Sequence, residues 1–113
     1  MNKNNNKIVI FITAGSKEEA VKIGKVLVKE RLVACCNILS SVNSIFWWHD
    51  EILKAKEVLL IAKSSIRLFD DIVKKVKEHH SYIVPEIIAI PIIAGSQDYL
   101  DWIENEIKGS DEK

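Results

Sequence analysis

The succession of apolar segments in this 113-residue chain predicts an α+β domain built on one four-stranded antiparallel sheet. Three observations lead to this fold class. Residues 7–14 form a β-branched, almost purely apolar run, which is typical of a strand covered on both faces. Two later segments have the apolar spacing of amphipathic helices, and a long strand–turn–strand unit lies between them.

The first helix is predicted to begin after Gly15, because Ser16 and Glu19 have the spacing of a capping box. Apolar residues then recur at helical spacing, at Ala20, Ile23 and Leu27. We expect this helix to end near residues 30–32.

A long hairpin follows, with arms at residues 33–48 and 52–62 and a turn at His49-Asp50-Glu51. Ser40-Ser41 and Asn43-Ser44 indicate a bend or bulge in the first arm. Arms of roughly 12–15 residues exceed the usual strand of about 5–6 residues, so the tip is expected to project beyond its own domain.

The second helix is expected after Ser64 or Ser65, either of which is a suitable cap, with His79 and His80 at its C-terminal end. Its apolar face consists of Phe69, Ile72, Val73 and Val76. Residues 82–93 then read as an apolar strand. Pro85 and Pro91 interrupt it, and since proline cannot donate to a ladder this strand is expected at a sheet edge.

A third helix is predicted after Gly95-Ser96, with Leu100, Ile103 and Ile107 on its buried side and Gly109 at its end. The complete order is βαββαβ with an extra C-terminal helix. Right-handed crossovers place both main helices on one face, which gives a ferredoxin-like sandwich with a long protruding β-hairpin. We expect one domain over residues 7–109, a disordered leader at 1–6 and a frayed tail at 110–113.

Composition excludes several classes of protein. The 16 basic and 16 acidic residues cancel, which leaves no electrostatic footprint for nucleic acid or an anionic membrane. The N-terminus resembles neither a secretory nor a transmembrane signal, so a cytoplasmic location is expected. Cys35 and Cys36 are adjacent, and neighbours in a strand point to opposite faces, so a disulfide between them is not expected.

The hairpin predicts a homo-oligomer. Its projecting part carries Ile45, Phe46, Trp47 and Trp48 in succession, so both faces of the strand would be apolar. Pairing with another copy would cover this surface, with Phe46, Trp47 and Trp48 as the interface. The alternative is a hairpin that folds back on its own sheet, with both tryptophans in an ordinary core.

His79 and His80 are the first candidates for metal ligands, since imidazole suits copper, zinc or nickel. Adjacent histidines diverge, so one of them would need Cys35, Glu86 or a residue of another subunit to complete a site. The alternative is that both histidines bond the free carbonyls at a helix end. Cys35 is either a Cu(I) thiolate ligand or a small buried hydrophobe.

Glu86 has further alternatives. It is a metal ligand, part of a small-ligand cleft between subunits, or the partner of a basic side chain within the oligomer. Arg31 is the candidate partner for Glu86 or Glu57, and Lys63 is a candidate for an anion pocket. We expect no enzyme, because Gly-x-Ser-x-Gly, P-loop, GxGxxG and His-Glu-x-x-His motifs are all absent from the sequence.

Several segments together resemble the CutA family of divalent-cation tolerance proteins. They are Glu30-Arg31-Leu32, Ala34-Cys35, Asn37, the run Ser44 to Trp48, Glu57, His80, Tyr82, Val84-Pro85-Glu86-Ile87, Pro91, Gly95 and Tyr99-Leu100-Asp101-Trp102. The resemblance implies a ferredoxin-like fold, a homotrimer similar to the PII signalling proteins, and tolerance of copper and other divalent metals. The alternative function is a PII-like regulatory module that binds a small metabolite or a partner protein at inter-subunit clefts.

The chain departs from the family pattern at four places. Ser81 replaces a common proline, Ile83 a polar residue, and Ser40-Ser41 a Pro-Gly pair. Ile12 stands where some members have a cysteine suggested as a copper ligand, which weakens a thiolate site carried over from the family.

Overall fold

The computed structural model describes residues 6–109, so the predicted leader, except Asn6, and the predicted tail at 110–113 lie outside the described residues. The strands are β1 (Lys7–Ala14), β2 (Cys35–Trp48), β3 (Glu51–Ser65) and β4 (Ile87–Pro91). The helices are α1 (Lys17–Lys29), α2 (Phe69–His79) and α3 (Gln97–Glu106), and a 3₁₀ turn at Ile66–Leu68 leads into α2.

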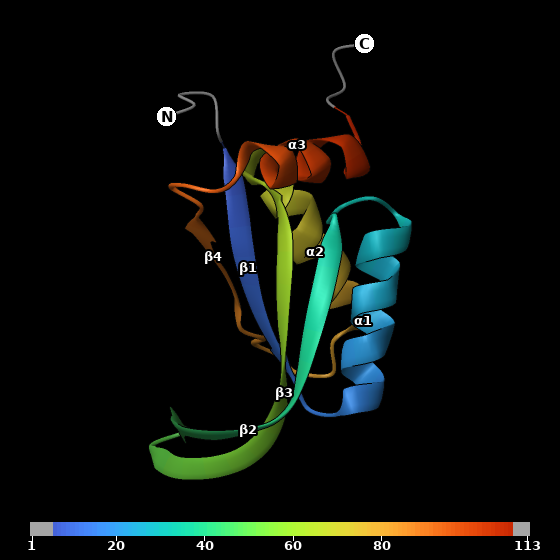
Figure 1. Ribbon diagram of the computed structural model, residues 1–113. Helices are drawn as coiled ribbons and strands as arrows, with labels where there is room; N and C mark the ends of the chain where they lie inside the picture. Colours follow the sequence, from blue (N-terminus) through green and yellow to red (C-terminus); the bar gives the residue numbers. More distant parts are fainter. Residues whose placement is uncertain (1–5, 110–113) are drawn as a thin grey trace.

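The predicted fold class is confirmed. The strands form one antiparallel sheet in the order β2-β3-β1-β4, which is the ferredoxin-like arrangement. Helices α1 and α2 cover one face, and α3 lies across the end of the sheet where β1 begins (Figure 1). Strand β4 pairs only with β1, so it lies at an edge, as Pro85 and Pro91 predicted for this segment.

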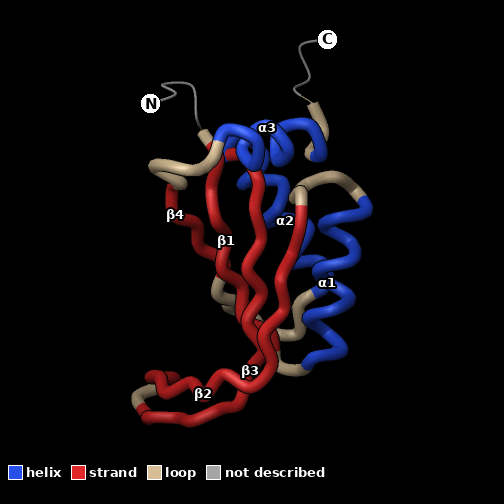
Figure 2. Tube along the Cα trace, viewed as in Figure 1, coloured by secondary structure: helices blue, strands red, loops and turns tan. Residues whose placement is uncertain are grey.

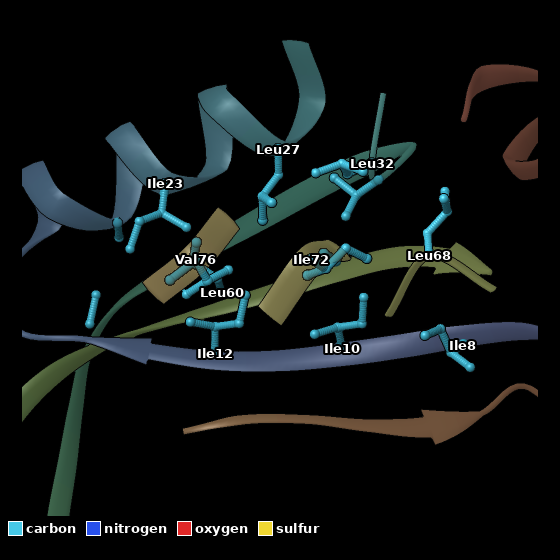
Figure 3. Close-up of a cluster of buried hydrophobic side chains, with 14 of the residues drawn as sticks. Ile8, Ile10, Ile12, Ile23, Leu27, Leu32, Leu60, Leu68, Ile72 and Val76 are labelled. Carbon is cyan, nitrogen blue, oxygen red and sulfur yellow. The ribbon is translucent and has the colours of Figure 1, made fainter. Parts of the chain in front are cut away.

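The core lies between the sheet and the helices α1 and α2. Alternate residues of β1 point to this side, and their partners come from β3 and from both helices (Figure 3). The completely buried side chains of this layer include Ile10, Ile12, Ile23, Leu27, Val33, Leu60, Ile72 and Val76. Burial of each is worth about 1.5–3 kcal/mol, so this layer holds both helices on the sheet.

Helix α1 begins and ends with recognisable caps. The Ser16 hydroxyl accepts the Glu19 N–H at 3.1 Å, as predicted, but the Glu19 carboxylate accepts from Ser81 instead of completing the capping box. At the other end Arg31 adopts a left-handed φ of 58°, and the Leu32 N–H donates to the Leu27 carbonyl. This Schellman-type end turns the chain into β2.

The hairpin bends where the sequence indicated a bulge. The register shifts between Leu39 and Val42, so Ser40 and Ser41 together oppose Val58, and Ser41 has a φ of 72°. Asn43-Ser44 is regularly paired, so the bulge lies at Ser40-Ser41 alone. Beyond the bulge both arms curve away under the sheet (Figure 2).

The hairpin turn is shorter than predicted. It needs only His49 and Asp50, because Trp48 pairs with Glu51 and both turn residues have positive φ. Positive φ at both central residues makes this a turn of type I′, whose twist matches that of the flanking strands.

The helical segment begins after Ser65 as predicted, but the serine hydroxyls bond elsewhere, and the two neighbouring strands have other limits than predicted. Strand β3 continues to Ser65, and the Ser64 hydroxyl donates to the Leu32 carbonyl at 2.6 Å, while the Ser65 hydroxyl donates to Asn6. Neither serine side chain caps the turn or helix that follows. Strand β4 begins at Ile87, not at residue 82, because Pro85 lacks an N–H and restricts the residue before it.

The end of α3 also differs from the prediction. The helix ends at Glu106 rather than at Gly109, since Ile107 leaves the helical conformation and enters the core. Lys108 then donates its N–H to the Arg31 carbonyl. Glu104 fixes the same helix to the sheet, with Lys7 and Arg67 each 2.9 Å from its carboxylate.

Candidate functional site

The face of the sheet opposite α1 and α2 is apolar and largely open. Paired residues share a face, so Ile61, Phe11 and Ile88 form one continuous row across three strands. Ile88 and Ile90 each expose about half of their surface, at 52% and 49%. Among the described helices only α3 reaches this side, at one end. Such a continuous apolar face is unusual on a monomer.

The hairpin tip is exposed as predicted. Trp47 exposes 70% and Trp48 41% of its surface, and Ile45 and Ile52 are also open to solvent. The alternative in which both tryptophans enter the core of their own chain is therefore wrong for the single chain. Whether another copy covers them is a separate matter that stays a prediction.

A groove lies where the curved hairpin faces the segment that precedes β4. We call it the acid–aromatic groove. Its volume is about 760 Å³. Residues 44–48 and Leu53 of the hairpin form one side, residues 82–84 with Glu86 form the other, and Thr13 and Glu57 complete the lining.

Glu57 and Tyr82 hold the groove together. Glu57 exposes only 7% of its surface, and the Tyr82 hydroxyl donates to its Oε2 at 2.8 Å. Burial and the neighbouring Glu57 carboxylate raise the pKa of Tyr82 to about 12, so the phenol keeps its proton and remains a donor. Gly15 allows the ring to lie this close, since a Cβ there would stand 3.2 Å from the Tyr82 hydroxyl oxygen.

His80 is bonded through both ring nitrogens. Its Nδ1 accepts the Tyr82 N–H at 3.0 Å, and its Nε2 lies 2.7 Å from the Thr13 carbonyl oxygen. A carbonyl only accepts and a backbone N–H only donates, so the ring is the Nε2–H tautomer. The side chain is fully buried, with Glu19 3.3 Å from Nδ1. The carbonyl that the ring bonds belongs to β1 and not to the end of α2, so this contact differs from the helix-end bonding considered as the alternative to a metal site.

Cys35 lies far from His80. Cys35 pairs with Lys63, which pairs with Val9, whereas His80 bonds to Thr13, four residues further along β1. Four strand residues span about 13 Å, so the predicted pair of ligands is not brought together in one chain. Cys35 instead contacts the Tyr99 hydroxyl, with 3.6 Å between sulfur and oxygen. That hydrogen bond and burial raise the pKa of Tyr99 to about 12.

The two cysteines point to opposite faces, as predicted, and both are free thiols. Cys36 faces α1, where its sulfur would lie 3.3 Å from a Cβ at Gly24. Burial, followed by the neighbouring Cys35, raises the pKa of Cys36 to about 11, while Lys63 lowers it less strongly. A thiol in this state is a poor metal ligand, because the thiolate is the ligating form.

The remaining predicted ligands are His79 and Glu86. His79 is the last residue of α2 and is half-buried, and Glu86 is exposed in the acid–aromatic groove. Neither side chain has a hydrogen-bond or ion-pair partner among residues 6–109. Within that part of the chain, no three His, Cys, Asp or Glu side chains are grouped to hold a metal ion.

Within the single chain Arg31 does not pair with either of its two candidate partners, and a pairing between subunits stays a prediction. Arg31 bonds the carbonyl and carboxylate of Glu106 in α3 rather than Glu86 or Glu57. Lys63 donates to the Asn37 side chain. Sequence reasoning had considered Glu57 only as a partner for arginine, and it missed the Tyr82 bond because these residues are 25 positions apart. The sequence feature that could have indicated this bond is Glu57 itself, an acidic residue directly before the apolar run of β3.

The fold and site together define a class: a ferredoxin-like domain with a projecting aromatic hairpin and an open apolar sheet face. Within residues 6–109 no helix is long and apolar enough to cross a membrane. The model of the family described as CutA1 divalent ion tolerance protein matches residues 8–106. The chain belongs to this family.

Named relatives agree with this assignment. A divalent-cation tolerance protein CutA from Thermus thermophilus is 44% identical over 95 residues, which are 84% of this chain and 92% of the relative. A solved structure of the divalent cation tolerance protein from the same organism superposes with a TM-score of 0.89 at 41% identity, covering 90% of this chain and 99% of that one. The structure of a protein described as periplasmic divalent cation tolerance protein CutA from Archaeoglobus fulgidus gives a TM-score of 0.87 at 41% identity, with the same coverage.

Proposed function

We propose that this protein is a homotrimeric, non-enzymatic divalent-cation tolerance protein that binds copper or other divalent metal ions. The observation that carries the proposal is the family match over residues 8–106, together with relatives whose names state divalent-cation tolerance. We also propose a cytoplasmic location, as the sequence predicted, although the Archaeoglobus fulgidus protein is described as periplasmic.

The open sheet face and the hairpin tip support the oligomer. Both are apolar and exposed in the single chain, and the exposed part includes Trp47, Ile88 and Ile90. Covering these side chains with another copy would remove several hundred Å² of apolar surface from water, worth about 25 cal/mol per Å². Closed symmetry is the usual way for identical chains to cover such a surface.

We assign the metal site to the junction between subunits. His80 is bonded to Thr13 and Tyr82, and Cys35 contacts Tyr99. His79 and Glu86 are the two predicted ligands without such contacts among the described residues, and imidazole and carboxylate both suit divalent ions. Two donors do not complete a coordination sphere, so another copy would supply the rest.

Calorimetric titration tests this proposal. The tag-free protein is titrated with Cu(II), and with Cu(I) under anaerobic reduction, alongside His79→Ala/Glu86→Gln. Glu18→Gln is the control, since Glu18 is an exposed acid of α1. We expect saturable binding at a fixed ratio per subunit that the double variant loses and the control keeps. Equal binding by all three proteins would show that these residues are not ligands.

The acid–aromatic groove favours a second candidate function, a PII-like regulatory module that binds a small molecule. Ligand pockets usually measure about 300–1,000 Å³, and the groove falls within that range. Binding to the native state would raise the melting temperature as the ligand concentration rises above its dissociation constant. A ligand screen that leaves the melting temperature unchanged would remove this candidate.

A further inference from the structure

We infer that a second groove, which lies between α1 and β2, binds the anion of a medium-chain fatty acid. We call it the α1–β2 groove. The inference goes beyond the proposed function, and it needs neither the metal site nor the acid–aromatic groove.

The α1–β2 groove forms where helix α1 lies against an edge strand of the sheet (Figure 1). Gly24 permits this close approach, since a Cβ there would stand 3.3 Å from the Cys36 sulfur and 3.7 Å from Ile38 Cδ1. Within the described chain β2 pairs only with β3, so no further strand closes the outer side of the groove. The volume is about 540 Å³. Sites for small molecules usually measure about 300–1,000 Å³.

The groove lies on the helix side of the sheet. Cys36 and Ile38, its lining residues from β2, pack against the core, whereas the side chain of Cys35 points to the opposite, open face. The surfaces proposed for contact between subunits are that open face and the hairpin tip. Assembly through these two surfaces therefore leaves the α1–β2 groove open to a ligand.

The floor of the groove is apolar and carries no charge. Val21 and Val28 of α1 line it together with Cys36 and Ile38, and Val28 exposes 42% of its surface. Burial, followed by the neighbouring Cys35, raises the pKa of Cys36 to about 11, while Lys63 lowers it less strongly, so the thiol keeps its proton. Residues 21–28 extend over about 10 Å of helix axis, which is close to the length of the alkyl chain of octanoate. An alkyl chain laid on this floor would remove apolar surface from water.

Lys25 and Lys29 set the sign of the ligand's charge. They lie one helical turn apart on the same side of α1, and both line the groove. Neither forms an ion pair within residues 6–109, and no aspartate or glutamate of that range lines the groove. A carboxylate would find two cations within reach, whereas a cationic amphiphile would be repelled. An anionic head on an alkyl chain matches both the charge and the apolar floor.

The test uses octanoate as the probe, with 1-octanol as the uncharged control and acetate as the control without an alkyl chain. Binding is measured by calorimetry on the full chain at low ionic strength, with EDTA present and below the concentration at which octanoate forms micelles. We expect saturable binding of one octanoate per chain, with hexanoate weaker by about threefold for each methylene lost. Both controls should bind at least tenfold more weakly. No binding of octanoate, or equal binding of octanoate and either control, would overturn the inference.

Variants locate the site. Lys25→Gln/Lys29→Gln should weaken octanoate binding at least tenfold. The matched control is Lys17→Gln/Lys22→Gln, which removes the same charge from exposed positions of α1 outside the groove and should bind octanoate as the native protein does. Equal weakening by both pairs would show a general effect of charge and refute the site.

A third variant tests the floor independently of the charge. Val28→Thr keeps the shape of the side chain but replaces a methyl group with a hydroxyl, so it should weaken octanoate binding severalfold and leave the response to acetate unchanged. Val28 and both lysines are exposed, so these substitutions should not disturb folding. Unchanged octanoate binding in either groove variant would refute the assignment. All the variants keep His79 and Glu86, so copper titration and molar mass on the same samples test the proposed function separately.

Discussion

Replacing His80 separates a structural histidine from a metal ligand. In His80→Ala the Thr13 carbonyl loses its donor and the Tyr82 N–H loses its acceptor. Water replaces the second bond, because Tyr82 lies in an exposed segment, but Thr13 is buried. A buried group left unsatisfied costs about 1–3 kcal/mol, and the space left by a fully buried ring adds a similar amount. We therefore expect a loss of about 3 kcal/mol in the free energy of unfolding.

The assay is thermal unfolding at one fixed protein concentration with EDTA present, since the melting temperature of an oligomer depends on concentration. For a domain of this size 1 kcal/mol corresponds to about 4 °C, so His80→Ala should melt about 12 °C lower. His79→Ala is the matched control. This neighbouring histidine has no described partner, and its replacement should change stability by no more than about 0.5 kcal/mol.

The result that would refute this reasoning is clear. If His80→Ala unfolds like the native protein in EDTA, and copper raises the melting temperature of the native protein alone, His80 is a ligand and its two hydrogen bonds contribute little. Equal destabilisation by both substitutions would mean that the C-terminal end of α2 depends on both rings.

Three other predictions follow from the structure. Trp47→Ser/Trp48→Ser should remove several kcal/mol of apolar burial per subunit and yield monomers or aggregates, and elution as an unchanged oligomer would contradict the proposed interface. Burial, followed by the neighbouring Cys35, raises the pKa of Cys36 to about 11 from 9.0. A Cys35→Ser variant keeps the larger cause, burial, so its Cys36 thiol should react with iodoacetamide at least about 10-fold more slowly at about pH 8 than an unperturbed thiol, and an equal rate would contradict the burial. Partial burial opposes ionisation of Glu104, but its bonds to Lys7 and Arg67 outweigh this effect and lower the pKa of the carboxyl group. These ion pairs therefore stabilise the fold above pH 4.5, the ordinary pKa of glutamate, and the stabilisation is lost as the pH falls below that value. Denaturant unfolding of Glu104→Gln should therefore show a deficit near neutral pH of less than about 1 kcal/mol that vanishes in acid, and a deficit that persists at low pH would refute the assignment.

The fold was predictable because its signals are local. The apolar, β-branched run located β1, and the Ser16 cap with helical spacing located α1. The adjacent serines at 40 and 41 marked the bulge that bends the hairpin. Errors arose where distant parts of the chain compete for the same group, as when the Ser64 hydroxyl bonds a carbonyl 32 residues away instead of capping a helix.

The site was less predictable for the same reason. His80, Tyr82 and Glu57 form one connected set, but its bonds join residues that are far apart in sequence. Residue type alone suggested that His80 and Cys35 were ligands, and only the strand register shows that about 13 Å of sheet separates their positions. The exposed tryptophans were predicted correctly, since a hairpin longer than its covering helix exposes its tip in any single chain.

The central claim is that the open sheet face and hairpin tip bring three chains together, and the molar mass in solution tests it most directly. Light scattering on the eluting, tag-free protein should give about 38 kDa, three times the 12.8 kDa of the chain, over a wide range of concentration. A stable particle of 12.8 kDa would contradict the claim, because the apolar face would then be exposed to water and no second subunit would complete a metal site.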